Sequence, residues 1–599
     1  GCNILVSAAA GSGKTAVLVE RIFKRITDKK DPVNVDQFVV VTFTKLAAAQ
    51  MKDRLRERIE EALAEDPSNE HLLRQGGRLS LAHISTVHSF CSEIVKRYFH
   101  RIGLDPAFRM GTEAETRLLM QDVLDELLEE EYGKGEEDFL ELAGMSEFNR
   151  HDDEMGNLIG RIYNQMMGQP FPLRFLDEME AFYDAQTVDE WENSGFMKNL
   201  LASTKTFLQG ILQEYKALKD ICHGPNQPLF YEPYLDEMLA FLSDLPENSG
   251  YEEYRAYFGR LPKLTIRAPR GLTGEEKVNK EAVRLSCKDA EKRMVEWKEQ
   301  YFDKEAEEHL NDLKDTSRKM KALFRLTRRL HELFVAEKRE RGILDFNDLE
   351  QLTISILLQK DEESGAYVRT DAAKELANEF VEIMIDEYQD SNYVQDTILH
   401  AVSRDGLAGE MPNIFMVGDA KQSIYRFRGA RPELFAEKLL SYNKKEGTLY
   451  RRIDLQKNFR SREIVLESTN EVFSRMMHTD IGGVEYDDEA KLHLGSDFEN
   501  TEKKIAKNVD VYAILGKQNM EAEGTLAALK IQEMVSGETP LYVKDKEGYR
   551  KAEYGDVVII VQTNSQGQAY FDALKDYEIP AVMEKKRGFF DTREIGLMV

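Results

Sequence analysis

The sequence has few cysteines, no long apolar run and no excess of positive charge. Its cysteines lie far apart and form no CxxC pair, so it predicts neither a zinc or iron–sulfur site nor a disulfide framework; they are Cys2, Cys91, Cys222 and Cys287. No apolar run approaches the ~20 residues of a membrane helix, and VVIIV at 557–561 is predicted to be a buried strand. These absences favour a reducing, cytoplasmic setting without membrane contact.

Acidic residues outnumber basic ones. The chain carries 108 Asp+Glu against 81 Lys+Arg, a formal net charge of −27. This balance argues against indiscriminate binding to nucleic acid, but a local basic groove is compatible with it. Residues 121–142 hold ten acids and Lys134 as their one base, which predicts a solvated helix face. Residues 314–329 hold seven bases and one acid, Asp315, which fits either a DNA-facing ridge or a solvated face.

The first motif with a clear chemistry is AAAGSGKT. A short apolar strand at 4–7 leads into it, and a helix with one apolar face follows, which is the context that a P-loop requires. Gly11 and Gly13 would let backbone N–H groups surround phosphate oxygens. Lys14 would reach the β- and γ-phosphates, and the Thr15 hydroxyl would hold Mg²⁺. The expected ATP-binding residues are Ala8, Ala9, Ala10, Gly11, Ser12, Gly13, Lys14 and Thr15, with Ala8 where the usual pattern has glycine.

A carboxylate pair follows a second apolar strand, in VEIMIDEYQD at 381–390. The strand at 381–385 would deliver Asp386 and Glu387 to its carboxyl end, where open α/β sheets bind ligands. Asp386 would hold Mg²⁺, and Glu387 would orient and deprotonate the attacking water. More than 370 residues separate this motif from the P-loop, so a large insertion must lie between them.

Aromatic and hydroxyl residues follow two further predicted strands. Phe43 and Thr44 come after the strand at 38–42, and Thr86, His88 and Phe90 lie in ISTVHSFC at 84–91. Hydroxyls and histidine can donate to phosphates, and phenylalanine can stack on a base, a combination that suits single-stranded nucleic acid. Packing of these residues in a core is the alternative.

Two loops complete the set. The strand at 414–419 runs into a loop with Gln422, Tyr425, Phe427 and Arg428. Arg460 follows the strand at 452–455 and is either a surface charge or a group that neutralises a γ-phosphate.

These motifs resemble, in order and character, those of UvrD/Rep-like superfamily-one helicases. The motifs are AAAGSGKT, TFTKLAAAQM, STVHSFC, DEYQD, GDAKQSIYRFRGA and NFRS. GILDFNDLE at 342–350, KQSIYRFR and GFFDTREI at 588–595 are most similar to the AddA (RexA) type, the helicase-nuclease subunit of bacterial recombination complexes. Lys45 and Gln50 depart from the usual Asn and Glu of that family, which bears on the DNA contacts of their loop.

The resemblance implies roles for these residues. Lys14, Thr15, Asp386 and Glu387 would perform ATP·Mg²⁺ chemistry, while Gln422 would sense the γ-phosphate and Arg460 would contact it. Single-stranded DNA would lie against Phe43, Thr44, Thr86, His88, Tyr425, Phe427 and Arg428. It also implies 3′→5′ translocation, action at single-strand/double-strand junctions in double-strand break repair, and a partner subunit of the AddB (RexB) type.

The expected fold class is α/β, a P-loop NTPase with RecA-like parallel sheets. The first RecA-like domain would comprise 1–110 and 343–452, split by a helical insertion at 111–342. Apolar stripes at helical spacing support that insertion, one of them Leu119, Val123 and Leu127. A second, truncated RecA-like domain would occupy 453–599, with strands at 556–562 and 579–583 and a helix at 568–577.

Three alternatives stay open. One is a UvrD/Rep-like repair helicase without a nuclease. Another is a P-loop ATPase of a different class, which would need an LSGGQ-type signature that we do not find, and the last is a module that clamps DNA without turnover. The chain begins inside a strand, so we expect it to be part of a longer protein. The family's adenine-reading Gln motif, second phosphate-contacting arginine and nuclease domain would lie outside it, and we expect this stretch to bind nucleotide, to hydrolyse it slowly and not to be the nuclease.

Overall fold

The structure is a computed structural model that describes residues 1–145, 152–223, 228–246, 250–263, 266, 274–478, 483–496, 498, 505, 508–514, 519–545 and 548–583. It contains two compact units. The first comprises Gly1–Ala8, Lys14–Asp454 and His478–Val484, and the second comprises Ala9–Gly13, Leu455–Met477 and Glu485–Val599. No helix within the described ranges is both long and apolar enough to span a bilayer. The GFFDTREI motif lies outside the described residues.

A six-stranded sheet forms the centre of the first unit, in the order β10-β1-β9-β8-β2-β3. Its strands are β1 (Asn3–Ala8), β2 (Phe38–Thr42), β3 (His83–Thr86), β8 (Glu382–Ile385), β9 (Ile414–Gly418) and β10 (Tyr450–Leu455). The pairs β1–β9, β9–β8, β8–β2 and β2–β3 are all parallel. Strands buried on both faces read as continuous apolar runs, which is why FVVVT and IFMV predicted them. The expected α/β class with a parallel sheet is confirmed.

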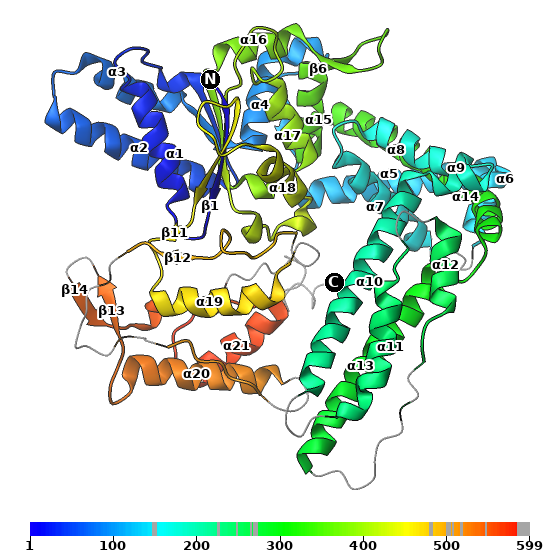
Figure 1. Ribbon diagram of the computed structural model, residues 1–599. Helices are drawn as coiled ribbons and strands as arrows, with labels where there is room; N and C mark the ends of the chain where they lie inside the picture. The colour runs from blue at the N-terminus through cyan, green and yellow to red at the C-terminus, as the bar shows by residue number, and fades with distance from the viewer. Residues whose placement is uncertain are drawn as a thin grey trace. The chain divides into compact units, whose positions relative to one another are not determined.

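Helices cover both faces of this sheet (Figure 1). On one side lie α1 (Lys14–Ile26), α2 (Lys45–Glu65) and α3 (Glu70–Arg78); on the other lie α4 (Val87–Tyr98), α15 (Phe346–Leu357), α16 (Asp371–Glu379) and α17 (Tyr393–Ala401). In α1 the predicted apolar face, Leu18, Ile22 and Ile26, is fully buried. The short helix α18 (Pro432–Ser441) follows the loop after β9.

The register of the sheet brings the motif-bearing loops to one edge. Ser7 pairs with Gly418, and Ile385 pairs with Met416, so β1, β8 and β9 end side by side. Val41 pairs with Ile385 in the same way. The carboxyl ends of the strands therefore place the residues after β2, β8 and β9 along one edge, the usual ligand-binding edge of such sheets.

Helices fill the chain between the early and late strands. They are α5 (Glu113–Lys134), α6 (Glu137–Ala143), α7 (Asp152–Met167), α8 (Pro172–Ala181), α9 (Val188–Glu192), α10 (Gly195–Cys222), α11 (Glu232–Ser243), α12 (Tyr251–Gly259), α13 (Gly274–Tyr301) and α14 (Ala306–Glu340). The predicted stripe Leu119, Val123 and Leu127 is buried in a core that α5, α6, α7 and α14 share. Short pairs β4–β5 (Arg109–Met110, Ile343–Leu344) and β6–β7 (Leu358–Lys360, Tyr367–Arg369) accompany them. The proposed domain boundaries at 111 and 342 stay a prediction.

The basic stretch 314–329 lies on α14 and is largely neutralised by acids. Six of its seven bases donate to protein groups: Lys314, Arg318, Lys321, Arg325, Arg328 and Arg329. Arg325 reaches Glu131 at 2.6 Å, and Glu131 is 1% exposed, so the acidic stretch is not wholly the solvated face that its composition predicts. The stretch 314–329 therefore ties α14 to the neighbouring helices.

The second unit differs from its prediction. It contains α19 (Glu463–Met476), α20 (Met520–Ser536), α21 (Asn564–Asp576) and the pairs β11–β12 (Lys457–Asn458, His493–Leu494) and β13–β14 (Tyr542–Asp545, Gly548–Lys551). The strands expected at 556–562 and 579–583 are wrong for the described residues, because neither segment has a ladder of hydrogen bonds to a neighbour. Val557 and Ile559 pack on a small core with Ile531 and Leu574, whereas Ile560 is exposed rather than buried.

Candidate nucleotide and DNA site

Three of the predicted catalytic residues meet at the carboxyl edge of the sheet. Lys14, the first residue of α1, places its Nζ 2.6 Å from Oε2 of Glu387 and 3.4 Å from Oε1 of Gln422. Glu387 follows β8, and Gln422 follows β9. Strands distant in sequence thus deliver a cation, a carboxylate and an amide to one point, as the motifs predict.

Asp386 lies at the same edge and is nearly buried. Its backbone N–H donates to the carbonyl of Val41 at 2.9 Å, which fixes it to the end of β2. Burial and the adjacent charge of Glu387 raise the pKa of Asp386 to about 6, while Lys14 opposes the shift. A buried carboxylate of this kind gains from a cation beside it.

A magnesium ion fits this chemistry. Carboxylate and hydroxyl oxygens are the ligands Mg²⁺ prefers, and it is commonly held by one or two protein groups together with substrate phosphates. Asp386 and Thr15, in the first turn of α1, supply such oxygens. Among the described residues no cluster of three or more His, Cys, Asp or Glu side chains forms a closed metal site.

Glu387 has an unusual backbone. It lies in the left-handed region with φ 51° and ψ 47°, and within the described ranges only Glu578 shares positive φ among non-glycine residues. For a residue with a side chain such a conformation costs on the order of 1–3 kcal/mol, so the surroundings must hold it. In this conformation the carboxylate of Glu387 pairs with Lys14 at 2.6 Å.

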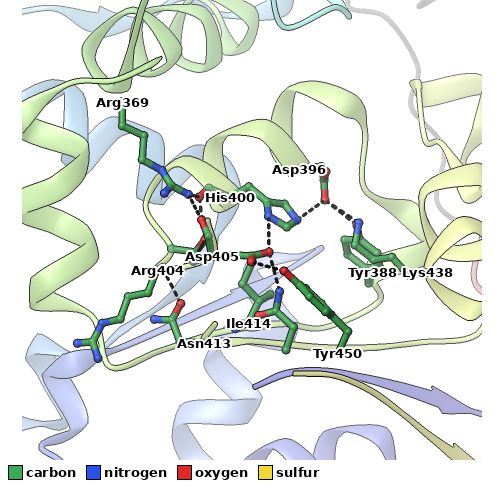
Figure 2. Close-up of polar contacts among 12 residues, drawn as sticks. Arg369, Tyr388, Asp396, His400, Arg404, Asp405, Asn413, Ile414, Lys438 and Tyr450 are labelled. Carbon is green, nitrogen blue, oxygen red and sulfur yellow. Dashed lines mark hydrogen bonds and ion pairs between the residues drawn. The ribbon is translucent and has the colours of Figure 1, made fainter. Parts of the chain in front are cut away.

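The residue after Glu387 is anchored by a buried polar network (Figure 2). The hydroxyl of Tyr388 donates to Asp396 at 2.6 Å and accepts from Lys438 of α18. His400 lies between Asp396 and Asp405, 3.6 and 3.7 Å away, and burial lowers its pKa. Through Tyr388, this network holds the first residue of the turn Tyr388–Asp390, which directly follows Glu387.

The glycine-rich loop, Ala9–Gly13, belongs to the second compact unit. Gly11 and Gly13 have φ of 70° and 88°, conformations that favour glycine. The amide of Asn458 donates to the carbonyl of Ala10 at 2.7 Å, and a Cβ added to Gly11 would lie 2.6 Å from that amide nitrogen. Arg460 belongs to the same unit, with its N–H bonded to Asn458. The phosphate-binding roles of 8–13 and of Arg460 stay predictions.

Four predicted DNA-binding residues form one aromatic and cationic stripe. The rings of Phe43 and Tyr425 stack with centroids 4.5 Å apart, and Tyr425 and Phe427 are 6.0 Å apart. The Arg428 guanidinium lies 5.2 Å and 5.5 Å from the rings of Tyr425 and Phe427. Phe427 is 78% exposed. Tyr425, Phe427 and Arg428 stand on the loop that also carries Gln422, and Phe43 follows β2.

The remaining predicted DNA contacts lie in other settings. Thr44 and Thr86 cap α2 and α4, accepting hydrogen bonds from Ala47 and Ser89. Phe90, for which base stacking and core packing were both left open, is 1% exposed and packs in the core.

His88 is half-exposed, and its ring lies 4.6 Å from that of Phe346. The buried carboxylate of Glu350 lies 3.3 Å from its Nε2. Phe346 and Glu350 both belong to GILDFNDLE at 342–350. The sequence analysis did not name either residue as part of a site, because their residue types alone do not indicate one. The resemblance of GILDFNDLE to the AddA type is the feature of the sequence that could have identified them.

Comparisons with known proteins agree with this geometry. Residues 1–443 match the UvrD/REP helicase N-terminal domain and 453–599 match the UvrD-like helicase C-terminal domain. An ATP-dependent helicase/nuclease subunit of Lachnoclostridium phytofermentans is 38% identical over 99% of this chain and 46% of its own length. The proteins of the same name from Clostridium perfringens and Bacillus licheniformis are each 36% identical, over 99% and 100% of this chain and 50% and 49% of their own lengths. The chain spans about half the length of these curated relatives. With family domains matched along most of its length, the chain belongs to the UvrD/REP helicase family.

Proposed function

We propose that the chain is the motor part of an ATP-dependent DNA helicase that translocates 3′→5′ on single-stranded DNA. The observation that carries the proposal is the loop 419–431. Gln422 near its start contacts Lys14, which pairs with Glu387, and three members of the aromatic stripe, Tyr425, Phe427 and Arg428, follow within six residues. One short segment thus touches both the ATP chemistry and the predicted DNA surface.

The residues of the site supply the parts of phosphoryl transfer. Lys14 would bind the β- and γ-phosphates, and Glu387 would then be released from Lys14 to take a proton from the attacking water. Gln422 would contact the γ-phosphate, and Arg460 would add positive charge to it. Thr15 and Asp386 would hold Mg²⁺, which when bound neutralises phosphate charge. The amides of 8–13 would surround the phosphates.

Single-stranded DNA would lie on the aromatic stripe. Stacking of a base on an aromatic side chain contributes about 1–3 kcal/mol and tolerates any sequence. Phe43 and Phe427 offer exposed ring faces, and Arg428 adds a cation beside them. His88 and Phe346 offer a further face.

We further propose a role in double-strand break repair together with a second subunit of the AddB type, acting at single-strand/double-strand junctions. The support is the name of the similar proteins, which describes each of them as a subunit of a helicase/nuclease. A UvrD/Rep-like repair helicase without nuclease is the second candidate, and the two matched helicase domains are compatible with it as well.

ATP hydrolysis by the full-length protein, with and without oligo(dT), tests the proposal. We expect stimulation by oligo(dT), and Glu387→Gln should lower the stimulated kcat by about 10²–10⁴-fold, the usual contribution of a general base. Nucleotide binding by this variant should persist. Equal turnover with and without oligo(dT) in the wild-type protein would contradict the motor function.

A further inference from the structure

Gln389 has no role in the function proposed so far, yet its side chain lies between two parts of the site. It is 1% exposed, two residues after Glu387. Its Nε2 donates to Oε2 of Glu387 at 2.7 Å, and its Oε1 accepts from the backbone N–H of Asp419 at 2.9 Å. Only this orientation of the amide gives a carboxylate a donor and an N–H an acceptor.

These two bonds complete a closed ring of contacts. Asp419 accepts from Nε2 of Gln422 at 2.8 Å, and Gln422 in turn accepts from Lys14 at 3.4 Å. Lys14 returns to Glu387 at 2.6 Å. The ring of contacts therefore runs from Glu387 through Gln389 and Asp419 to Gln422, and it returns to Glu387 through Lys14.

The backbone of Gln389 is attached to the same loop. Its carbonyl accepts from the hydroxyl of Ser423 at 3.2 Å, and the carbonyl of Ser391 accepts from the N–H of Arg431 at 2.9 Å. The loop that carries the aromatic stripe is thus bonded at both ends to 389–391. A Cβ at Gly418 would collide with Oε1 of Gln389, which shows how closely β9 approaches this amide.

We propose that Gln389 is a positioning residue that transmits the position of the loop 419–431 to the carboxylate of Glu387. DNA on the aromatic stripe would move or hold that loop, and the amide of Gln389 would follow the N–H of Asp419. When Lys14 turns to a phosphate, Gln389 is the remaining side-chain donor that this structure records on Glu387. The left-handed backbone of Glu387 adds to its dependence on such a partner.

This inference rests on the proposed function and predicts a specific kinetic signature. Gln389→Met keeps the length of the side chain but has neither donor nor acceptor. Its oligo(dT)-stimulated kcat should fall about 10- to 100-fold, the usual effect of losing a hydrogen bond to a charged group, while the unstimulated rate falls by less than about threefold. The KM for ATP and the Kd of a fluorescent ATP analogue and of oligo(dT) should stay within about twofold. The ratio of the two rates therefore falls.

A second variant separates the two halves of the amide. Gln389→Glu keeps an acceptor for the N–H of Asp419 but places a second carboxylate against Glu387. It should lose stimulated turnover at least as strongly as Gln389→Met. Gln351→Met is the matched control: Gln351 also makes two hydrogen bonds, to the carbonyls of Met167 and Gln169, away from this ring, and its kinetics should equal those of the wild type.

The outcomes distinguish the two proposals. A wild-type protein without DNA stimulation contradicts the proposed helicase function itself. Stimulation in the wild type that persists in Gln389→Met overturns the role of Gln389. An equal fall of the stimulated and unstimulated rates also overturns it, because a merely structural residue would lower both. If the Met variant fails to fold, with nucleotide binding lost, Gln389→Glu decides by the same ratio.

Discussion

Removal of the Lys338 ammonium tests how the helical segment is joined to the sheet-bearing part. Lys338 of α14 is 1% exposed, and its Nζ lies 2.7 Å from Oδ2 of Asp345 and 2.7 Å from Oδ1 of Asp348. Lys338→Met keeps the apolar stem but leaves two carboxylates without their cation. Breaking a buried pair from one side costs about 3–5 kcal/mol, and we expect a loss of that size in the free energy of unfolding.

The pH dependence gives the sign of the effect. Burial and the charge of Asp345 raise the pKa of Asp348 to about 6, with Lys338 opposing. Because this folded-state pKa lies above the ordinary aspartate value of 3.8, the stability contribution of Asp348 is complete below that ordinary value and is lost as pH rises through about 6. Without Lys338 the carboxylate is more costly to ionise, so the deficit of Lys338→Met should be largest at about pH 8 and shrink toward about pH 5.

Urea unfolding of wild type and variant at these two pH values measures this. Lys374→Met is the matched control, because Lys374 pairs with Asp371 at the surface, where an ion pair contributes only about 0–1 kcal/mol. A deficit that is equal at both pH values, or below that of the control, would refute the reasoning from burial. Addition of Asp348→Asn to Lys338→Met should recover part of the loss at the higher pH.

Three further predictions concern the two sites and α14. Phe427→Ala should weaken oligo(dT) binding by about 5- to 150-fold, the equivalent of about 1–3 kcal/mol of stacking, measured by fluorescence anisotropy; an unchanged Kd would remove Phe427 from the DNA surface. Gly11→Ala should weaken binding of a fluorescent ATP analogue at least about tenfold, because φ is 70° and the new Cβ would meet Asn458; an unchanged Kd would exclude a phosphate role for that backbone. Arg325→Ala should cost about 1–3 kcal/mol in urea unfolding by removing one of the two cations on the buried Glu131, the other being Lys134, yet leave the Kd for DNA unchanged; weakened DNA binding without lost stability would restore a DNA-facing ridge.

Local sequence patterns were sufficient for the sheet but not for every apolar run. The predicted strand 38–42 matches β2 residue for residue, because a five-residue apolar run is typical of a strand buried on both faces. VVIIV at 557–561 has the same composition, yet a strand also needs a neighbour for its hydrogen bonds, and within the described residues it has none. Pairing is a tertiary property that no single segment encodes.

The site was predicted in kind but not in its connections. The motifs identified Lys14, Glu387 and Gln422, which the structure brings together. The link through Gln389 depends on the register of β8 against β9, which places two residues distant in sequence within hydrogen-bonding range. Phe90 shows a second limit of prediction from motifs. A motif shows that an aromatic residue is present, but whether its ring lies in the core or at the surface depends on tertiary packing, and Phe90 lies in the core.

The neutralised bases of α14 have a consequence for how the protein would hold DNA. Bases that already pair with acids neutralise few DNA phosphates and so release few of the counterions condensed on the DNA, which means that they contribute little to the salt dependence of DNA binding. Arg428, in turn, lies over aromatic rings. We therefore expect a shallow slope of log K against log salt for this chain. DNA binding that depends on base stacking more than on phosphate contacts should show little sequence preference and should persist over a broad range of ionic strength.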